Sequence, residues 1–480
     1  MQELADRALN AAQLEGATYA DVRVVESRSQ LVEVKDRRAT ALMEDQGLGF
    51  GVRALVDGAW GFAASAHPDA AEAERCAALA CRIARASARF RLQPIALSPV
   101  APARATYQTP IVRDPFEVPL ADKIDLLVRA TAAMQGERGI AVAQGSLRFW
   151  DERKLFASSE GARIEQRIVH SGAGLCAYAR GDDDLQWRSY PTSFGGQYEA
   201  AGWELVERLD LVAHAPETAA TAVALLSAPQ CPALATTVIL DGAQMSLQIH
   251  ESCGHPTELD RVLGHEANYA GMSFLTTDQL HTLRYGSPVV NLVADATAPR
   301  GLGTFGFDDE GVPAQKVDLV REGRFVGYLT SRETAPLLGL ASNGTMRAES
   351  WAHIPLMRMT NINPEPGPWT LAALIADTDD GILMATNRSW SIDDRRYNFQ
   401  FGTEAGWEIK RGKRGRLLKN CTYTGITPQF WNQCDAVCDD WEIWGTPNCG
   451  KGQPSQSMRT AQGAASARFR GIQVGVGYGA

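Results

Sequence analysis

Residues 236–255, TTVILDGAQMSLQIHESCGH, determine how the second half of the chain is organised. The apolar run at 238–240 and the following Asp241-Gly242 predict a buried strand that ends in a turn. A helix is expected from about Ala243, and it carries the pattern His250-Glu251-x-x-x-His255. This stretch therefore places two imidazoles and a carboxylate directly after a core strand.

The five-residue spacing between the two histidines sets a geometric condition. In the His-Glu-x-x-His helix of zinc peptidases, imidazoles four residues apart share one face. At about 100° per residue, five steps place His255 roughly 140° around an ideal helix from His250. One metal can hold both only across a widened turn such as a π-bulge, and Gly254 gives the backbone that freedom. We therefore predict an irregular turn here, against the alternative of two histidines flanking an ordinary buried turn.

A catalytic zinc usually takes three protein ligands and leaves the fourth position to water. The two histidines supply two ligands, and the third stays open among Glu258, Asp260, His265 and a distant cysteine. Cys449 lies in a glycine-flanked loop, and its thiolate would favour zinc over magnesium or calcium. The adjacent Lys451 would help to keep a thiol ionised. Glu251 is the candidate general base, and its alternative is an exposed helix glutamate.

The composition excludes several classes of function. A net charge of −9 argues against a general nucleic-acid or anionic-membrane binder. No apolar run reaches 18 residues, and the start lacks a basic region followed by an apolar core, so we expect no membrane span and no signal peptide. Nine scattered cysteines suit a reducing compartment better than a disulfide framework. We therefore expect a cytoplasmic protein.

In the first half of the chain, the order of helical and strand patterns predicts an α+β domain over residues 1–228. We expect a sandwich-like unit with an antiparallel or mixed sheet. A proline-rich connection joins its subregions 1–90 and 105–226. Periodicity predicts helices at 1–15, 68–88, 120–135, 199–214 and 217–226. It predicts strands at 19–26, 30–35, 47–55, 146–157, 162–171 and 174–180.

The sequence pattern of residues 233–480 predicts a β-rich, barrel-like catalytic domain that carries the histidine helix. Beyond that helix only 331–338 and 371–376 show a helical pattern. The Gly-x-Gly-x-x-Gly at 301–306 leads into a turn at 307–311, so we do not expect dinucleotide binding. The basic run at 410–419 is interpreted as a solvated hairpin tip. Cys434-x-x-x-Cys438 with Cys421 lacks a nearby fourth ligand for a structural zinc.

Six blocks in order resemble the TldD/PmbA family of metallopeptidases, once described as modulators of DNA gyrase. They are Asp241-Gly242, His250-Glu251-x-x-x-His255, FDDEGVP at 307–313, RAESWAHIP at 347–355, RMTN at 358–361 and Cys449-Gly450-Lys451. The resemblance spans essentially the whole chain. It departs from the family at 427–444, and at Pro256-Thr257-Glu258, where a glycine-rich motif is expected. Because the histidine motif is present, the chain looks like a catalytic TldD-type subunit.

The resemblance implies Zn²⁺ held by His250, His255 and Cys449, with Glu251 as the base of a metalloendopeptidase. It implies peptide or unfolded-protein substrates in a cleft shared with a PmbA-type partner subunit or formed by a homodimer. Extended peptides are commonly held by strand addition, which suits a β-rich domain.

Two roles are open for Arg347, His353 and Arg358. They either line this cleft, or they support it from the surface or from behind the residues that line it. The alternative function is a non-catalytic adaptor subunit of a peptidase complex with a vestigial metal site, which the awkward histidine spacing motivates. Modulation of gyrase or binding of nucleic acid is not expected at this net charge.

Overall fold

The computed structural model describes residues 1–475. A curved eight-stranded sheet forms the first half, in the order β3-β2-β1-β5-β6-β4, with β7 and β8 also paired to β6. The β4–β6 pairing is parallel and the β5–β6 pairing is antiparallel, so the sheet is mixed. Its strands are β1 (Tyr19–Lys35), β2 (Arg38–Val56), β3 (Ala59–Ser65), β4 (Arg104–Gln108), β5 (Ile140–Ser158), β6 (Arg163–Arg180), β7 (Leu185–Tyr190) and β8 (Gln197–Glu199).

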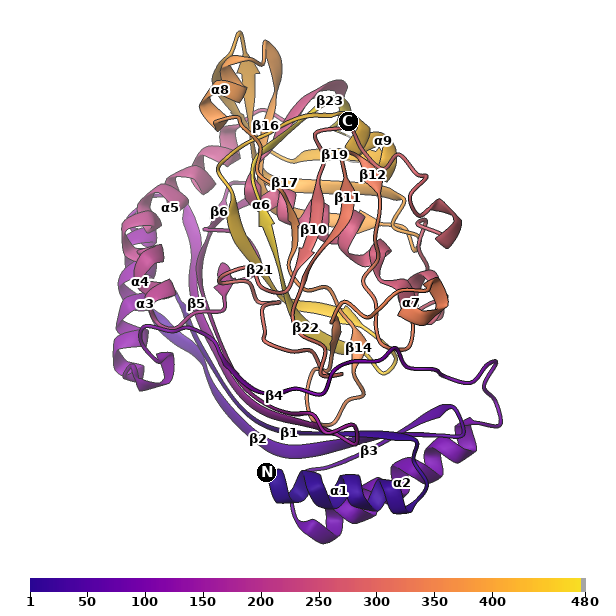
Figure 1. Cartoon of the computed structure of the whole chain (residues 1–480). Coiled ribbons are helices and arrows are strands. Elements are labelled where there is room, and N and C mark those ends of the chain that lie inside the picture. The colour runs from indigo at the N-terminus through magenta and orange to yellow at the C-terminus, as the bar shows by residue number, and fades with distance from the viewer. Residues whose placement is uncertain (476–480) are drawn as a thin grey trace.

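Helices cover the outer side of this sheet, and the second half of the chain fills its inner side (Figure 1). The helices are α1 (Gln2–Leu14), α2 (Ala70–Ser87), α3 (Leu120–Gln135), α4 (Glu204–Leu209) and α5 (Leu211–Ser227). Apolar side chains of α1 and α2 pack on one part of the sheet, and those of α3 and α5 pack on another. These two cores hold the sheet as a rigid support for the second half.

Three expectations for the first half are wrong in detail. The runs at 19–26 and 30–35 form one strand, β1, because β2 and β5 pair with its polar middle from both sides. The runs at 162–171 and 174–180 likewise form one strand, β6. Glu199 belongs to β8 and not to a helix, since its backbone pairs with Ser171 of β6. The next helix is split at Asp210, whose φ is 40° and whose side chain caps α5.

A closed barrel of five strands lies at the centre of the second half, which confirms the barrel-like, α+β expectation. Its strands are β9 (Leu234–Leu240), β16 (Asp380–Ile392), β17 (Asn398–Lys410), β19 (Cys421–Ile426) and β23 (Ala467–Val474). The ring runs β16-β9-β23-β19-β17 and closes through the β16–β17 pairing. At its margin, β18 (Lys413–Leu418) pairs with β17, and β20 (Cys434–Val437) pairs with β23. The basic run is therefore the β17–β18 hairpin, as expected.

Smaller sheets and short helices surround the barrel. The sheets are β10 (Leu292–Asp295), β11 (Lys316–Arg321), β12 (Arg324–Phe325) and β15 (Ile362–Pro364); β13 (Met346–Arg347) and β14 (Leu356–Met357); and β21 (Glu442–Lys451) and β22 (Gln456–Ala464). The helices are α6 (Gly242–Ile249), α7 (Leu259–Val262), α8 (Leu371–Ala376) and α9 (Thr427–Asn432). The helix expected at 331–338 is only a 3₁₀ turn, Ala335–Leu338, because Ser331 and Thr334 bond each other's backbone instead.

Buried charges join the two halves. Asp309 accepts from Lys154 of β5 at 2.6 Å, and Arg53 of β2 donates to Glu310 at 3.2 Å. All four side chains are nearly buried. The turn at 307–311 thus anchors the second half on the inner face of the sheet. Among the described residues, no helix is long and apolar enough to cross a membrane.

Candidate metal centre

The histidine motif lies at the end of α6, which leads directly out of barrel strand β9. Asp241 begins the helix by accepting from the Gln244 amide at 2.7 Å. After Ile249 the chain forms a π-helical turn, His250–Gly254, and then a 3₁₀ turn, His255–Thr257. The expected widened turn is therefore present. It brings the rings of His250 and His255 to a centroid separation of 4.9 Å.

Three side chains could hold a metal ion at this turn. The ligand atoms of His250, His255 and Cys449 all lie within 4.8 Å of one another, and all three residues are buried. Cys449 comes from β21, and its Sγ lies 3.5 Å from His255 Nε2. In the described part of the chain, this is the one such group of histidine, cysteine and acidic residues.

His255 is oriented for coordination by the residue that follows its turn. Its Nδ1 lies 3.0 Å from Glu258 Oε2, so the Nδ1 proton is donated to the carboxylate and Nε2 faces Cys449. Burial lowers the pKa of His255 well below its usual value. Carboxylates behind a ligating histidine fix its tautomer in metal sites. Glu258, one of the candidates for the third ligand, therefore lies behind His255.

His250 is held by Gln462 of β22. The Gln462 amide lies 3.0 Å from His250 Nδ1 and 3.1 Å from the Thr446 hydroxyl. A hydroxyl and an amide can each donate and accept, so turning the amide by half a rotation lets its oxygen accept the Nδ1 proton. That orientation leaves Nε2 free as a ligand.

The surroundings of Cys449 favour the deprotonated thiolate form of its side chain. Burial by itself would raise the pKa of this thiol, but His255, His250 and Arg358 together hold the pKa well below its usual value. The Arg358 guanidinium is fully buried and donates to the main-chain carbonyl of Cys449. Two imidazoles and one thiolate form a donor set that suits Zn²⁺ and leaves a fourth position open.

Glu251 lies beside the ligands with its carboxylate fixed on one side. Glu251 Oε2 accepts from Arg396 Nη1 at 2.6 Å. Arg396 belongs to the turn between β16 and β17, 145 residues further along the chain. Nothing in the sequence points to this arginine, because a charged turn at 393–397 carries no signal that connects it to the motif.

A cavity of about 270 Å³ opens over these residues. Residues 444–450 of β21 line it, together with Trp390 and Arg396. The lining also includes Thr192, Ser193 and Phe194, which belong to the loop between β7 and β8. The first half of the chain therefore contributes directly to the candidate site.

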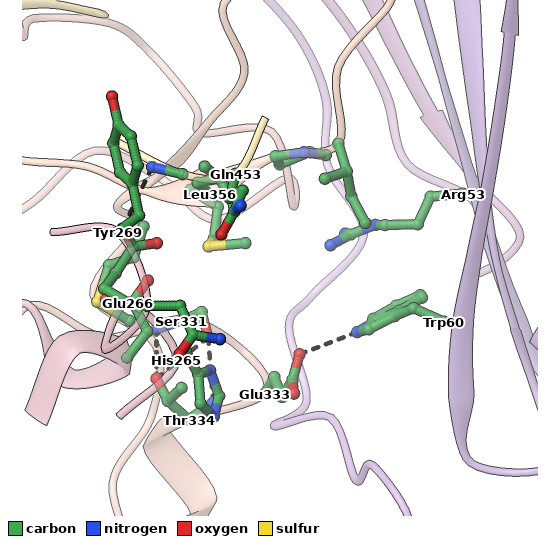
Figure 2. A pocket seen from close by; sticks show the side chains of 17 residues that line it. Arg53, Trp60, His265, Glu266, Tyr269, Ser331, Glu333, Thr334, Leu356 and Gln453 are labelled. Carbon is green, nitrogen blue, oxygen red and sulfur yellow. Dashed lines mark hydrogen bonds between the residues drawn. The ribbon is translucent and has the colours of Figure 1, made fainter. Parts of the chain in front are cut away.

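Figure 2 shows a separate cavity, of about 350 Å³, between the sheet and the second half. Arg53 and Trp60 line it from the sheet, and Trp60 donates to Glu333 at 2.9 Å. Asp260 and His265 also line this cavity and not the one over the histidines. Asp260 is paired there with Lys451 at 2.8 Å. The structure thus separates both of these third-ligand candidates from His250 and His255.

Arg347, His353 and Arg358 do not line the cavity over the metal centre. Arg347 donates to the main-chain carbonyls of Arg459 and Met359, and His353 pairs with the Ser350 hydroxyl at 2.9 Å. Arg358 donates to main-chain carbonyls of β21 and β22. We propose a supporting role for Arg347 and Arg358, which is one of the two roles expected for them.

The remaining cysteine set does not form a metal site among residues 1–475. Burial raises the pKa of both Cys434 and Cys438 to about 12, so these thiols stay protonated. The segment 427–444, which the family resemblance leaves without a role, packs against the motif. Trp431 of α9 donates to the Ser252 hydroxyl at 2.9 Å inside the π turn.

We expect Gly254→Ala to weaken metal binding. A β-carbon at Gly254 would lie 2.0 Å from Met359 Sδ, so the π turn must shift or Met359 must move. Overpacking of this kind costs about 1–3 kcal/mol of stability. Zinc affinity, measured by competition with a chelator, should fall about tenfold or more, as for other residues that orient ligands. The double variant Gly254→Ala/Met359→Ala should recover much of that affinity, and no recovery would contradict the steric account.

Three models of one metallopeptidase family match the chain. The model described as PmbA/TldA metallopeptidase domain 1 matches residues 20–84, and that of the central domain matches residues 113–226. The model of the PmbA/TldA metallopeptidase C-terminal domain matches residues 234–476, slightly more than half of the chain. The last match contains all three candidate ligands and Glu251.

Curated relatives carry names of the same kind. A metalloprotease of Methanocaldococcus jannaschii is 29% identical over 455 residues, covering 95% of this chain and 96% of that protein. A protein of Saccharolobus solfataricus named zinc metalloprotease TldD homolog is 25% identical over 244 residues, covering 50% of this chain and 51% of its own.

Solved structures share the fold over nearly the full length. A Thermotoga maritima protein, described as a modulator of a DNA gyrase, superposes with a TM-score of 0.79 at 16% identity, covering 98% of this chain and 99% of its own. TldE from Thermococcus kodakarensis superposes with a TM-score of 0.73 at 15% identity, with 98% and 99% covered. At these identities the likeness concerns the fold alone.

Proposed function

Because the chain belongs to the TldD/PmbA family of metallopeptidases, we propose that it is a zinc-dependent peptidase of the TldD type. The observation that carries this proposal is the cluster of His250, His255 and Cys449, with the Glu251 carboxylate beside it. The name of the Saccharolobus relative supports zinc as the metal. The substrates we propose are short peptides and unfolded proteins.

His250, His255 and Cys449 would hold the ion. Bound Zn²⁺ supplies Lewis acidity, which polarises a carbonyl and lowers the pKa of a coordinated water towards ~7. Glu258 keeps His255 in the ligating tautomer, and Gln462 steadies His250. Arg358 holds the main chain of Cys449 in place. These contacts set the ligand atoms before any metal arrives.

Glu251 would serve as the general base. Its Oε2 is engaged by Arg396, so the carboxylate cannot swing away from the cavity. The other oxygen is left to take a proton from the attacking water and then to deliver it to the leaving amine. Positioned proton transfer of this kind contributes about 10²–10⁴-fold to a rate.

The cavity suits an extended peptide better than a small molecule. Seven consecutive residues of β21, 444–450, line it, so a peptide main chain can lie alongside a strand. Ser193, Phe194 and Asn387 also line a neighbouring cavity of about 400 Å³ that includes Tyr178 and Trp187. We infer that a substrate extends from the metal centre into this aromatic space.

A partner subunit and a cellular location for this protein are also proposals. A PmbA-type partner subunit or a second copy of this chain would complete the cleft, and TldE from Thermococcus kodakarensis has the same fold. A cytoplasmic location remains a prediction, in keeping with nine unpaired cysteines. We continue to expect no binding of nucleic acid.

Removal of the metal should abolish hydrolysis reversibly. We expect zinc-loaded protein to cleave reduced, carboxymethylated lysozyme but not native lysozyme, because only an extended chain can enter the cavity. Dialysis against a chelator should lower the rate at least 100-fold, and one equivalent of zinc should restore it. The assay is the release of new amino groups over time. A protein that binds zinc stoichiometrically yet cleaves nothing would support the adaptor alternative instead.

A further inference from the structure

Arg396 is the one lysine or arginine among the described residues that line the metal cavity. Its guanidinium lies beside Glu251 in this space. A fixed guanidinium stabilises an oxyanion that develops on a substrate during hydrolysis.

The position of Arg396 is set by a braced turn. Asp393 accepts from the Arg395 and Tyr397 amides at 3.0 and 2.9 Å, and Arg396 adopts a φ of 64°. The Arg396 carbonyl accepts from the Thr427 hydroxyl at 2.8 Å. The guanidinium therefore enters the cavity from a fixed backbone, which is the condition for a preorganised donor.

The Arg396 side chain has an N–H group that donates to no acceptor among the described residues. Its Nη1 is engaged by Glu251, whereas its Nε is buried and has no partner among the described residues. Buried donors are normally satisfied, and an oxygen atom that enters the cavity would be a suitable acceptor for the Arg396 guanidinium.

We propose that Arg396 is a catalytic residue that donates to the carbonyl oxygen of the scissile peptide bond, a role that rests on the proposed peptidase function. The water oxygen bonds to the carbonyl carbon, its proton moves to Glu251, and the carbonyl π pair becomes the lone pair of an oxyanion beside Arg396. Cleavage of the C–N bond then returns this pair to the carbonyl, while the amine nitrogen takes the proton from Glu251.

A carbonyl oxygen fits this position better than the terminal carboxylate of a peptide. Arg396 touches the base directly, at 2.6 Å, so its free donors lie next to the water that Glu251 activates. The carbonyl under attack lies at that same place. A terminal carboxylate lies at least one residue further along the substrate, about 3.3 Å away along an extended chain.

The first test compares Arg396→Met and Arg396→Lys with Arg395→Met on zinc-loaded protein and carboxymethylated lysozyme. Arg395 is the exposed neighbour in the same turn, so its variant makes an identical charge change outside the cavity. We expect kcat to fall about 100-fold in Arg396→Met, with KM and zinc content changed less than about threefold. Arg396→Lys should keep part of the rate, and Arg395→Met should match the wild type.

A second measurement separates contact with substrate from mere orientation of Glu251. In the Glu251→Gln background, we expect Arg396→Met to weaken binding of the phosphinic peptide Phe-Ala-ψ[PO₂CH₂]-Ala-Phe by at least 30-fold. The phosphinate oxygens of this probe stand in for the tetrahedral oxyanion. Equal affinity with and without Arg396 in that background would overturn the proposal, since the arginine would then act only through Glu251.

The outcomes also separate this inference from the proposed function. If the wild type hydrolyses lysozyme and Arg396→Met does so at the same rate, the inference fails and the peptidase stands. If the zinc-loaded wild type neither hydrolyses carboxymethylated lysozyme nor binds the phosphinic peptide, the proposed function fails and the role of Arg396 fails with it.

Discussion

Glu251→Gln is expected to lower kcat at least 10³-fold while leaving one zinc per chain. The amide keeps the shape of the side chain and can still contact Arg396, but it cannot accept the proton of the attacking water. General-base catalysis accounts for up to about 10⁴-fold of an enzymatic rate, so the loss should approach that limit. The measurement is initial hydrolysis of carboxymethylated lysozyme alongside zinc content.

Glu333→Gln is the matched control for this variant. Glu333 lies in the separate cavity of Figure 2, where it accepts from Trp60, and it does not line the space over the histidines. The same change of charge there should leave the rate within about twofold of the wild type. A Glu251→Gln protein that keeps a tenth or more of the activity would remove Glu251 as the base.

The second large effect is expected from Cys449→Ala. This change removes the thiolate and leaves two imidazoles, too few to hold a catalytic zinc in its usual three-ligand site. At limiting zinc, hydrolysis should fall at least 10³-fold, and the apparent affinity for zinc should fall by a similar factor in competition with a chelator.

Cys438→Ala provides the comparison for that result. Cys438 is as deeply buried as Cys449, but it follows β20 and lies outside the metal-binding group. Its variant should lose stability through a small cavity and retain its affinity for zinc. A Cys449→Ala protein that binds zinc as tightly as Cys438→Ala would contradict the ligand assignment.

The local part of the site could be predicted from the sequence because its geometry depends on neighbouring residues. The helical period alone shows that a five-residue spacing needs a widened turn, and the π turn at His250–Gly254 is the result. The strand that leads into α6 was visible in the apolar run of β9. A β-rich, barrel-like domain was expected, but the strands that close the ring could not be identified, because closure depends on the non-local β16–β17 pairing.

The distant parts of the site could not be predicted from the residues alone. Cys449 approaches His255 across 194 positions, and Arg396 approaches Glu251 across 145, each through the pairing of strands. The family resemblance supplied Cys449 as a ligand, but nothing supplied Arg396. Arg358 was expected either to line the cleft or to support it, and it donates to the main-chain carbonyl of Cys449.

Strand lengths in the first half were underestimated for a related reason. Hydrophobic alternation stops at the polar middle of β1, near Ser27 and Ser29, yet the strand continues. Main-chain hydrogen bonds from β2 and β5 satisfy the backbone there, whatever the side chains are. A single sequence contains no signal for such two-sided pairing.

X-ray absorption at the zinc edge of the zinc-loaded protein tests the central claim most directly, because it reports the atoms around the ion. We expect one sulfur at about 2.3 Å and two imidazole nitrogens at about 2.0–2.1 Å, with one further light atom completing the shell. A shell without sulfur, or one with several sulfurs, would contradict a centre built from His250, His255 and Cys449.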